Sequence, residues 1–422
     1  MKSPVVHIVG AGAAGLAAAQ ALGSDGRREV VVHEAAPYAG GRRRTFHDDS
    51  LGLDFDTGNF PLISSWRASL SLIEAIGSRG EWRQETEPGV AFADFATGER
   101  WRLRPNTGRS PWWLLSEKRR GPGLTFSDFW TLRRLISAPS GATVISVGAR
   151  DLAYVKLLRP LTLAALNAPP ETASAELAGS VLRGALQAGG EGMRVLTPLT
   201  GFGRAFVEPL ARRLHRLGAA LRFGRRLVAL DFGAERVTAL EFEHDRIDLG
   251  PRDALILATP WSVTAGLVPG VEAPTGASST LTVHFAHPPP PRALAVIAAL
   301  NGPFDWLFAY RDRLSVTIKD AAARLDESRD RLAAECWRGV AALTGLSDAL
   351  PAWRIVPSRR ASCLATPDET ARRPLSRTAW PNLFLAGGHV GRKLPDSLEG
   401  AVQSGAEAAR FLLCESDPGD NG

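Results

Sequence analysis

The feature that most constrains this chain is a glycine-rich turn between an apolar strand and an alanine-rich helix. Val5, Val6, Ile8 and Val9 predict a short buried strand, and residues 16–22 predict a helix. Between them stand Gly10, Gly12 and Gly15, in the pattern Gly-x-Gly-x-x-Gly. The first glycine permits the tight bend, the second lets the backbone approach a diphosphate, and the third allows close helix–strand packing. The pattern therefore predicts a βαβ unit that binds a dinucleotide.

The second strand of this unit is expected at residues 30–33, and Glu34 stands at its end. A carboxylate at this position can accept hydrogen bonds from ribose hydroxyls, and it favours an unphosphorylated ribose. FAD or NAD is therefore expected rather than NADP. A glycine-rich turn can also exist for packing alone, but here the strand, turn, helix, second strand and acid fall in register, which favours the dinucleotide site.

The composition is that of a globular protein large enough for two domains. The chain has 422 residues, of which 45% are hydrophobic and 22% charged, and these values exclude the disordered and fibrous classes. The net charge of +6 comes almost entirely from arginine, and no recognised nucleic-acid-binding module accompanies it. No nucleic-acid partner is expected.

The cysteines and the start of the first strand bear on location. Cys336, Cys363 and Cys414 lie far apart and show no metal-ligand spacing, so we expect buried thiols in a reducing compartment and no metal site. The first strand is expected to begin at residue 5, which leaves no room for a signal peptide before it. We therefore expect a cytoplasmic protein, or one that is peripheral on the inner face of the plasma membrane.

Two further loops are expected to pass close to the cofactor. Gly40 and Gly41 permit close approach of the backbone, and Arg42 can meet phosphate or flavin oxygens. Farther on, an alternating strand at 54–56 leads into a turn at Gly58. The sequence thus predicts Gly40, Gly41, Arg42 and Gly58 as cofactor-binding residues.

The last part of the chain favours a flavin. A buried strand expected at 382–386 leads to two glycines, and a helix opens shortly after them. A long flavin would receive its second anchor at such a place, whereas NAD enzymes do not need one. FAD is therefore the expected cofactor, and the binding residues expected here are Gly387, Gly388, Glu399, Gly400 and Ala401.

These patterns predict an α/β protein. A Rossmann-like FAD-binding domain is expected from residues 1–80, 195–265 and 375–422, because strand and helix patterns return to it along the chain. A discontinuous α+β substrate-binding domain is expected from 81–194 and 266–374, with antiparallel strands between 281 and 318.

Residues 111–136 have an unusual composition. Tryptophan, phenylalanine and leucine alternate there with lysine and arginine, as in proteins that meet a lipid headgroup layer. The segment is either a membrane-facing helical segment or a helical lid with core aromatics and solvated arginines.

With these residues in hand, the chain resembles the FAD-dependent amine oxidase and phytoene desaturase superfamily. The resemblance covers the glycine turn with Glu34, the Gly-Gly-Arg loop at 40–42, the stretch 206–227 and the closing stretch 385–401. It implies an amine oxidase/glutathione-reductase-like FAD fold, with Leu227 at the contact with adenine.

A narrower resemblance, at 96–106 and 159–174, is to the hydroxysqualene dehydroxylase family. It implies reduction of hydroxysqualene to squalene by reduced FAD in hopanoid and squalene biosynthesis. It also implies an isoprenoid lipid substrate, a membrane nearby, and upstream squalene-pathway enzymes as partners.

The chain departs from the family pattern at several positions. An aspartate followed by an aromatic residue is expected where Gly388 and His389 stand, so a carboxylate that would accept a hydrogen bond from the cofactor is missing. Thr57, Phe60 and Ala168 replace asparagine, histidine and threonine of the pattern. These changes are consistent with a divergent relative that acts on another polyprenyl substrate.

The reaction implied by the family needs a proton for the departing water. His389 and Asp56 are the candidate acids, and Asn59 and Asn167 are candidate pocket residues. The alternative roles are that His389 bonds backbone and that Asp56 holds its own turn. Two other functions fit the same fold: a desaturase or amine oxidase, for which Lys319 or Lys393 would be the nearby lysine, and a non-catalytic isoprenoid carrier.

Overall fold

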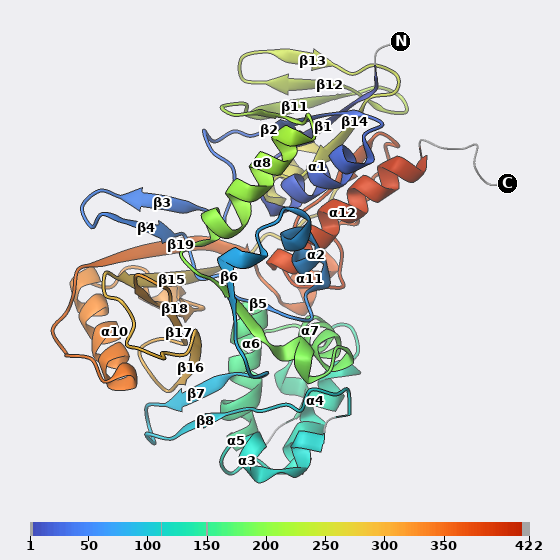
Figure 1. Cartoon of the computed structure of the whole chain (residues 1–422). Coiled ribbons are helices and arrows are strands. Elements are labelled where there is room, and N and C mark those ends of the chain that lie inside the picture. Colours follow the sequence, from blue (N-terminus) through green and yellow to red (C-terminus); the bar gives the residue numbers. More distant parts are fainter. Residues whose placement is uncertain (1–2, 111, 149–150, 416–422) are drawn as a thin grey trace.

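A five-stranded parallel sheet forms the centre of the first domain in this computed structural model, which describes residues 3–110, 112–148 and 151–415 (Figure 1). Residues 1–2, 111, 149–150 and 416–422 lie outside the described part. They include the first residue of the segment predicted at 111–136 and parts of both predicted domains. In spatial order the strands are β10 (Ala220–Arg222), β2 (Glu29–His33), β1 (Val5–Val9), β14 (Ala254–Leu257) and β20 (Leu383–Leu385). The strands predicted near 5–9, 30–33 and 382–386 are confirmed.

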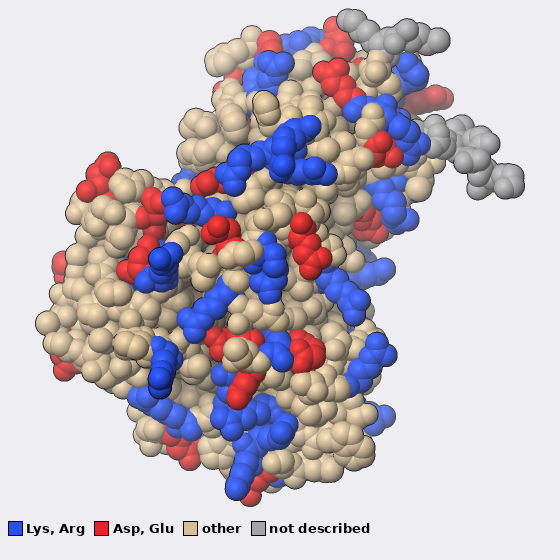
Figure 2. Space-filling model, in the orientation of Figure 1, with Lys and Arg blue, Asp and Glu red and all other residues tan. Residues whose placement is uncertain are grey.

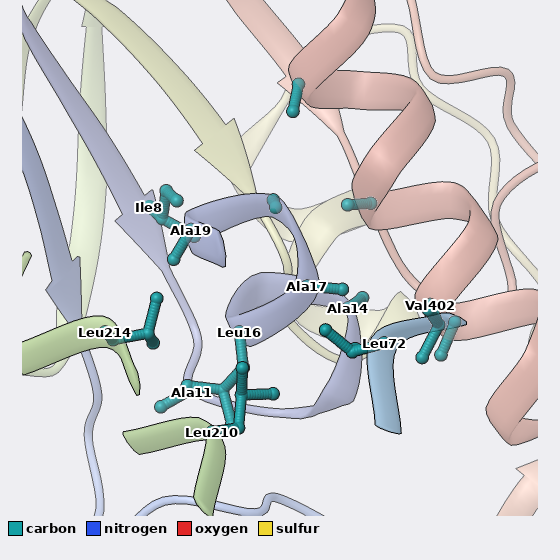
Figure 3. Close-up of a cluster of buried hydrophobic side chains, with 14 of the residues drawn as sticks. Ile8, Ala11, Ala14, Leu16, Ala17, Ala19, Leu72, Leu210, Leu214 and Val402 are labelled. Carbon is teal, nitrogen blue, oxygen red and sulfur yellow. The ribbon is translucent and has the colours of Figure 1, made fainter. Parts of the chain in front are cut away.

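Helices cover one face of this sheet. Alternate residues of each strand point to opposite sides, so one set of side chains faces these helices. Val6 and Ile8 of β1 lie in a core with α1 (Ala13–Asp25), α2 (Arg67–Ala75), α8 (Glu208–Arg216) and α12 (Leu398–Glu415), part of which is drawn in Figure 3. Helix α12 packs closely on α1, since a Cβ at Gly405 would overlap the carbonyl oxygen of Ala14.

An antiparallel sheet of three strands covers the other face. It consists of β11 (Leu227–Phe232), β12 (Val237–Phe242) and β13 (Arg246–Asp248). Val9 and Leu255 of the central sheet share a buried cluster with Leu227, Val237 and Leu240 of this layer. The central sheet is therefore buried on both faces, as expected for parallel strands.

A seven-stranded sheet forms the second domain. In spatial order its strands are β19 (Trp353–Cys363), β15 (Ala277–Phe285), β18 (Leu314–Lys319), β17 (Trp306–Ala309), β16 (Val296–Leu300), β7 (Ala91–Asp94) and β8 (Arg100–Arg102). All pairings are antiparallel except that between β16 and β7. Helix α10 (Arg329–Thr344) packs on one face through Leu332, Trp337 and Val340.

A helical layer lies beyond this sheet, at the lower end of Figure 1. It is built from a turn at Trp112–Leu115, α3 (Glu117–Arg120), a turn at Phe126–Asp128, α4 (Phe129–Ile136), α5 (Asp151–Ala153), α6 (Arg159–Leu166) and α7 (Ala175–Gln187). Helix α6 ends where Asn167 adopts a left-handed conformation with φ 53° ahead of Pro169. None of the described helices is long and apolar enough to cross a membrane.

The remaining elements connect these parts. They are the hairpin β3 (Thr45–Asp48) and β4 (Leu53–Asp56), the small sheet β5 (Leu62–Ile63), β9 (Val195–Pro198) and β6 (Trp82–Gln84), and the short helices α9 (Trp261–Leu267) and α11 (Pro367–Ala371).

Candidate active site

The three glycines of the first turn are required for different reasons. Gly10 has φ 110°, and a Cβ there would lie 2.5 Å from the carbonyl oxygen of Ala258. A Cβ at Gly15 would overlap the carbonyl oxygen of Gly10. Gly12 differs, because a Cβ there would meet no described atom within 4 Å. Gly12 thus faces open space directly before α1, where a helix N-terminus favours an anion.

Glu34 lies beside this turn at the end of β2. Its Oε2 accepts a hydrogen bond from the amide of Ala11 at 2.7 Å, and its Oε1 accepts one from Ala36 at 2.9 Å. The amide of Arg225 donates to the Glu34 carbonyl oxygen at 2.8 Å, which brings the segment leading to Leu227 alongside. The structure therefore gathers Glu34 and the start of β11 around one end of the glycine turn.

The Gly-Gly-Arg loop packs against the same turn. The amide of Gly40 donates to the Ala11 carbonyl oxygen at 2.8 Å, and a Cβ at Gly41 would lie 3.2 Å from Gly12 Cα. Arg42 was predicted to meet cofactor oxygens, but its guanidinium holds the Asp396 carboxylate in a two-pronged ion pair, with N–O distances of 2.6 and 2.8 Å. The sequence did not single out Asp396.

The closing strand and helix meet the loop from the other side. The amide of Gly387 donates to Ser404 Oγ at 3.1 Å, and that of Gly400 donates to Ser397 Oγ at 3.1 Å, so Ser397 caps α12. Ala401 is buried one residue further along the helix.

The side chain of Glu399 has a different role from the predicted contact with the cofactor. Its two oxygens accept the amides of Ala68 and Ser69 at 2.9 and 2.8 Å. These amides belong to the first turn of α2, so the carboxylate stabilises the positive end of that helix.

A cavity of about 430 Å³ runs from this region into the helical layer. Ligand sites usually enclose about 300–1,000 Å³. At the cofactor-domain end it is lined by Arg42, Arg43, Gly58, Asp396, Ser397 and Leu398, and at the helical end by Trp113, Phe129, Leu132, Leu157, Leu161 and Leu182. Most lining side chains are apolar, so the cavity suits a long hydrocarbon that ends near the cofactor.

Two of the predicted catalytic residues lie outside this cavity. The walls formed by the described residues include neither Asp56 nor His389. Asp56 is fully buried and accepts hydrogen bonds from Thr45 Oγ1 at 2.5 Å and the Phe202 amide at 3.0 Å. It therefore fixes the end of β4 against the loop before α8. Its hydrogen-bond partners among the described residues are these distant groups and not, as the alternative role had predicted, its own turn.

His389 is buried in the segment that follows β20. Burial lowers its pKa to about 4, so the imidazole is neutral near pH 7. Its ring packs against Gly387, where a Cβ would lie 2.5 Å from His389 Cε1, and against Trp261. A neutral ring outside the described cavity walls is poorly placed to give a proton to a substrate.

Asn167 and Asn59 do line the cavity, but their amides are occupied. Asn167 Nδ2 donates to Ser278 Oγ at 2.9 Å, and its Oδ1 accepts the Asp320 amide at 3.1 Å. Asn59 donates to Ser315 and Thr317 and accepts from Tyr310, all within 2.9 Å. Both side chains shape the wall by holding strands of the second sheet in place.

The charged residues on the cavity wall are nearly all basic. Among the described lining residues these are Arg42, Arg43, Lys156, Lys319 and Arg373, with Asp396 as the one acid. Burial lowers the pKa of Lys319 to about 8, although the nearby Asp305 opposes this shift. Lys319 is the last residue of β18, where strand alternation alone does not reveal that it meets a cavity.

These residues fit FAD. The open space at Gly12 before α1 suits the diphosphate, Glu34 and Leu227 lie where a ribose and adenine would be held, and Gly58, Arg42 and the capped start of α12 border the cavity where a flavin ring would lie.

Comparison with known proteins agrees with this fit. The profile of a family described as flavin containing amine oxidoreductase matches residues 13–413. Hydroxysqualene dehydroxylase of Rhodopseudomonas palustris is 39% identical over 413 residues, covering 97% of this chain and 99% of that protein. The protein of the same name from Zymomonas mobilis is 33% identical over 413 residues, covering 98% of this chain and all of that protein.

Solved structures confirm the predicted fold class. Putrescine oxidase bound to putrescine superimposes with a TM-score of 0.71 at 18% identity, over 97% of this chain and 100% of that one. Cyclohexylamine oxidase from Brevibacterium oxydans gives 0.72 at 16% identity, over 99% and 100%. The chain is thus an FAD-dependent oxidoreductase that belongs to the flavin-containing amine oxidoreductase family and is related over nearly its whole length to hydroxysqualene dehydroxylases.

Proposed function

We propose that this protein reduces hydroxysqualene to squalene. The observation that carries the proposal is the long apolar cavity, which joins the cofactor-binding end of the protein to the helical layer. The names of its relatives support the same substrate. In this reaction the carbon–oxygen bond breaks, the oxygen leaves as water, and reduced FAD supplies the hydride that forms the new carbon–hydrogen bond.

The charge on the cavity wall favours a neutral substrate over an amine. Among the described lining residues five are basic, and the one acid, Asp396, is already paired with Arg42. A protonated amine would therefore meet like charges without a free carboxylate to offset them. An uncharged isoprenoid alcohol meets no such barrier, which favours the dehydroxylase over the amine oxidase alternative.

Lys319 is the side chain best placed to give the proton. It lines the cavity, and with a pKa of about 8 it still carries most of its proton at pH 7. Its own amide donates to Asp305 Oδ2 at 2.8 Å, which fixes the end of β18. We assign to Lys319 the acid role for the departing hydroxyl that the sequence pattern suggested for His389 or Asp56.

The helical layer is suited to contact with an anionic membrane. Trp112 and Leu115 are 70% and 64% exposed, and Phe126 and Trp130 are also exposed. The neighbouring Trp113 and Phe129 point inward and line the cavity. The same short elements thus present apolar side chains both to the outside and to the substrate cavity.

Basic side chains surround this exposed apolar group. Lys118, Arg119, Arg133 and Arg134 are exposed beside it, and Figure 2 shows blue side chains gathered at the end of the molecule that carries α3. Tryptophan with arginine is typical of a surface that rests in a headgroup layer. The protein would therefore take its lipid substrate from the inner face of a membrane through this layer.

The deciding experiment is conversion by the purified, FAD-loaded protein. Incubation with hydroxysqualene and dithionite under anaerobic conditions should give squalene, detected by mass spectrometry. Ala165→Phe, which narrows the cavity, should lower conversion, whereas Ala406→Phe on an exposed position of α12 should not. No squalene from the flavin-loaded protein, or oxidation of primary amines in its place, would overturn the proposed reaction. A protein that binds squalene but never takes up flavin would instead be the carrier.

A further inference from the structure

The carboxylate of Asp396 occupies the space that a side chain at position 388 would need. A Cβ built on Gly388 would overlap Asp396 Oδ1 and would lie 3.0 Å from Asp396 Cγ. The backbone on both sides of Gly388 cannot easily yield, because buried Arg373 donates to the carbonyl oxygens of Gly388, His389 and Leu394. Residue 388 is therefore a glycine because a neighbouring carboxylate fills its place.

The Asp396 carboxylate is held in a defined orientation. Its side chain is 1% exposed, and it accepts two hydrogen bonds from Arg42 and one from the Cys363 amide at 3.0 Å. Burial alone would raise the pKa of Asp396, but the Arg42 charge and its hydrogen bonds hold that pKa well below its usual range. The group is thus a permanent anion.

This anion lies at the cofactor-domain end of the cavity. Asp396 lines the cavity next to Ser397, which caps the first turn of α12, and opposite Arg42 and Arg43. A carboxylate has about four acceptor sites, and three are used by Arg42 and Cys363. One remains for a hydroxyl or N–H donor in the cavity.

We infer that Asp396 supplies the cofactor-facing carboxylate that position 388 lacks, and that Gly388 and Asp396 form one exchangeable unit oriented by Arg42. The group that donates a hydrogen bond to Asp396 would be a hydroxyl of the ribityl chain or a ring N–H of FAD. The negative charge that is missing at position 388 is then present at position 396. This inference rests on FAD binding and not on the identity of the lipid substrate.

The test measures FAD binding and reduction potential in the full-length protein after removal of its flavin. Asp396→Ala should weaken FAD binding by about tenfold to a hundredfold and shift the potential of the bound flavin, because a charge-assisted hydrogen bond is lost. Gly388→Asp alone should also weaken binding, because two carboxylates would compete for one space. The double variant Gly388→Asp/Asp396→Ala should recover binding to within about threefold of the unchanged protein.

Two outcomes would overturn the inference. In the first, the losses of FAD affinity caused by Gly388→Asp and by Asp396→Ala simply add in the double variant. In the second, Asp396→Ala lowers the melting temperature of the flavin-free protein but leaves FAD affinity and potential unchanged, as a purely structural ion pair would. Asp48→Ala is the matched control, since it removes another largely buried carboxylate, paired with Arg354 at 3.3 Å, that does not line the described cavity.

Discussion

Asp56 and Arg313 face each other inside the protein, with 3.5 Å between Oδ2 and Nη2 and both side chains fully buried. Arg313 Nη1 also donates to the Thr200 carbonyl oxygen at 2.6 Å, while Asp56 accepts the Phe202 amide. The pair therefore joins β4 and the start of β18 to the segment that leads into α8. Its position explains why Asp56 is not a residue of the cavity wall.

Asp56→Ala should lower the free energy of unfolding by about 1–3 kcal/mol, because the buried Phe202 amide and Thr45 hydroxyl lose their acceptor, while Arg313 keeps its ion pair with Asp312 at 2.9 Å. Asp56→Asn should cost less, since the amide oxygen can still accept from Phe202. Urea denaturation followed by circular dichroism measures both. An Asp56→Ala protein with unchanged stability would contradict the structural role.

The stability of the protein should also depend on pH through Asp56. Burial raises the pKa of Asp56 to about 6, against the opposing charge of Arg313, whereas an unfolded aspartate titrates near about 4. Between these values the folded state binds more protons, so this contribution to stability is complete below about pH 4 and is lost as the pH rises through about 6. The loss should be absent from Asp56→Asn, and an identical pH profile in both proteins would refute this assignment.

Gly12→Ala should separate cofactor binding from folding. A Cβ at Gly12 meets no described atom, and the backbone has φ −77°, so the flavin-free protein should keep its melting temperature. FAD affinity should fall on the order of tenfold or more, because the methyl group enters the space expected for the diphosphate. Titration of the flavin-free protein with FAD measures this. Gly184→Ala, at an exposed position of α7 with equally open surroundings, is the control and should bind FAD normally.

Lys319→Met should lower conversion of hydroxysqualene by about a hundredfold to ten-thousandfold, the usual contribution of a positioned acid. In the unchanged protein the rate should fall as the pH rises through about 8, because the proton is then lost from Lys319. In Lys319→Arg the side chain keeps its positive charge but does not release its proton. Conversion by this variant should therefore remain slow, and its rate should not fall as the pH rises through about 8. If the arginine variant were fully active, Lys319 would contribute only its charge.

The protein should bind vesicles made of equal parts phosphatidylglycerol and phosphatidylcholine, and binding should weaken with salt. Each basic residue near an anionic surface contributes about 1 kcal/mol. Trp112→Ser with Trp130→Ser should reduce co-flotation with these vesicles. Leu375→Ser, which removes an equally exposed apolar side chain outside the helical layer, should not. Equal binding to vesicles of phosphatidylcholine alone would argue against the charged surface.

Local patterns were enough to predict the nucleotide-binding part of the protein. Gly10, Gly12 and Gly15 lie within one βαβ unit, so their roles follow from short-range periodicity and turn chemistry. Strand β19 was not predicted, because only a few of its residues are buried. The exposed Arg354, Arg359 and Arg360 interrupt the apolar pattern of the strand. Strand β16 lies within the region of antiparallel strands expected between 281 and 318, but on one side it pairs in parallel with β7.

Asn59 and Asn167 were predicted as pocket residues and do line the cavity. The contacts that hold the site together could not be predicted in the same way, because the partners are distant in sequence. Arg42 pairs with Asp396, Glu399 caps α2, and Asn167 bonds Ser278 of β15. Each contact depends on how two separate segments pack, and composition and periodicity carry no information about it. The sequence named Lys319 only as a possible lysine near the flavin of an amine oxidase, and its place on the cavity wall follows from the position of β18.

The strand order of the central sheet has a consequence for biosynthesis. Strand β14 pairs with β1 and β20 pairs with β14, while α12 packs on α1 at Gly405. A ribosome releases β1 and α1 first and β20 and α12 much later, so Val6 and Ile8 remain without their final cover for most of translation. The central core is therefore complete only after α12 has been synthesised, and until then its exposed apolar strands make the emerging polypeptide a natural client for chaperones.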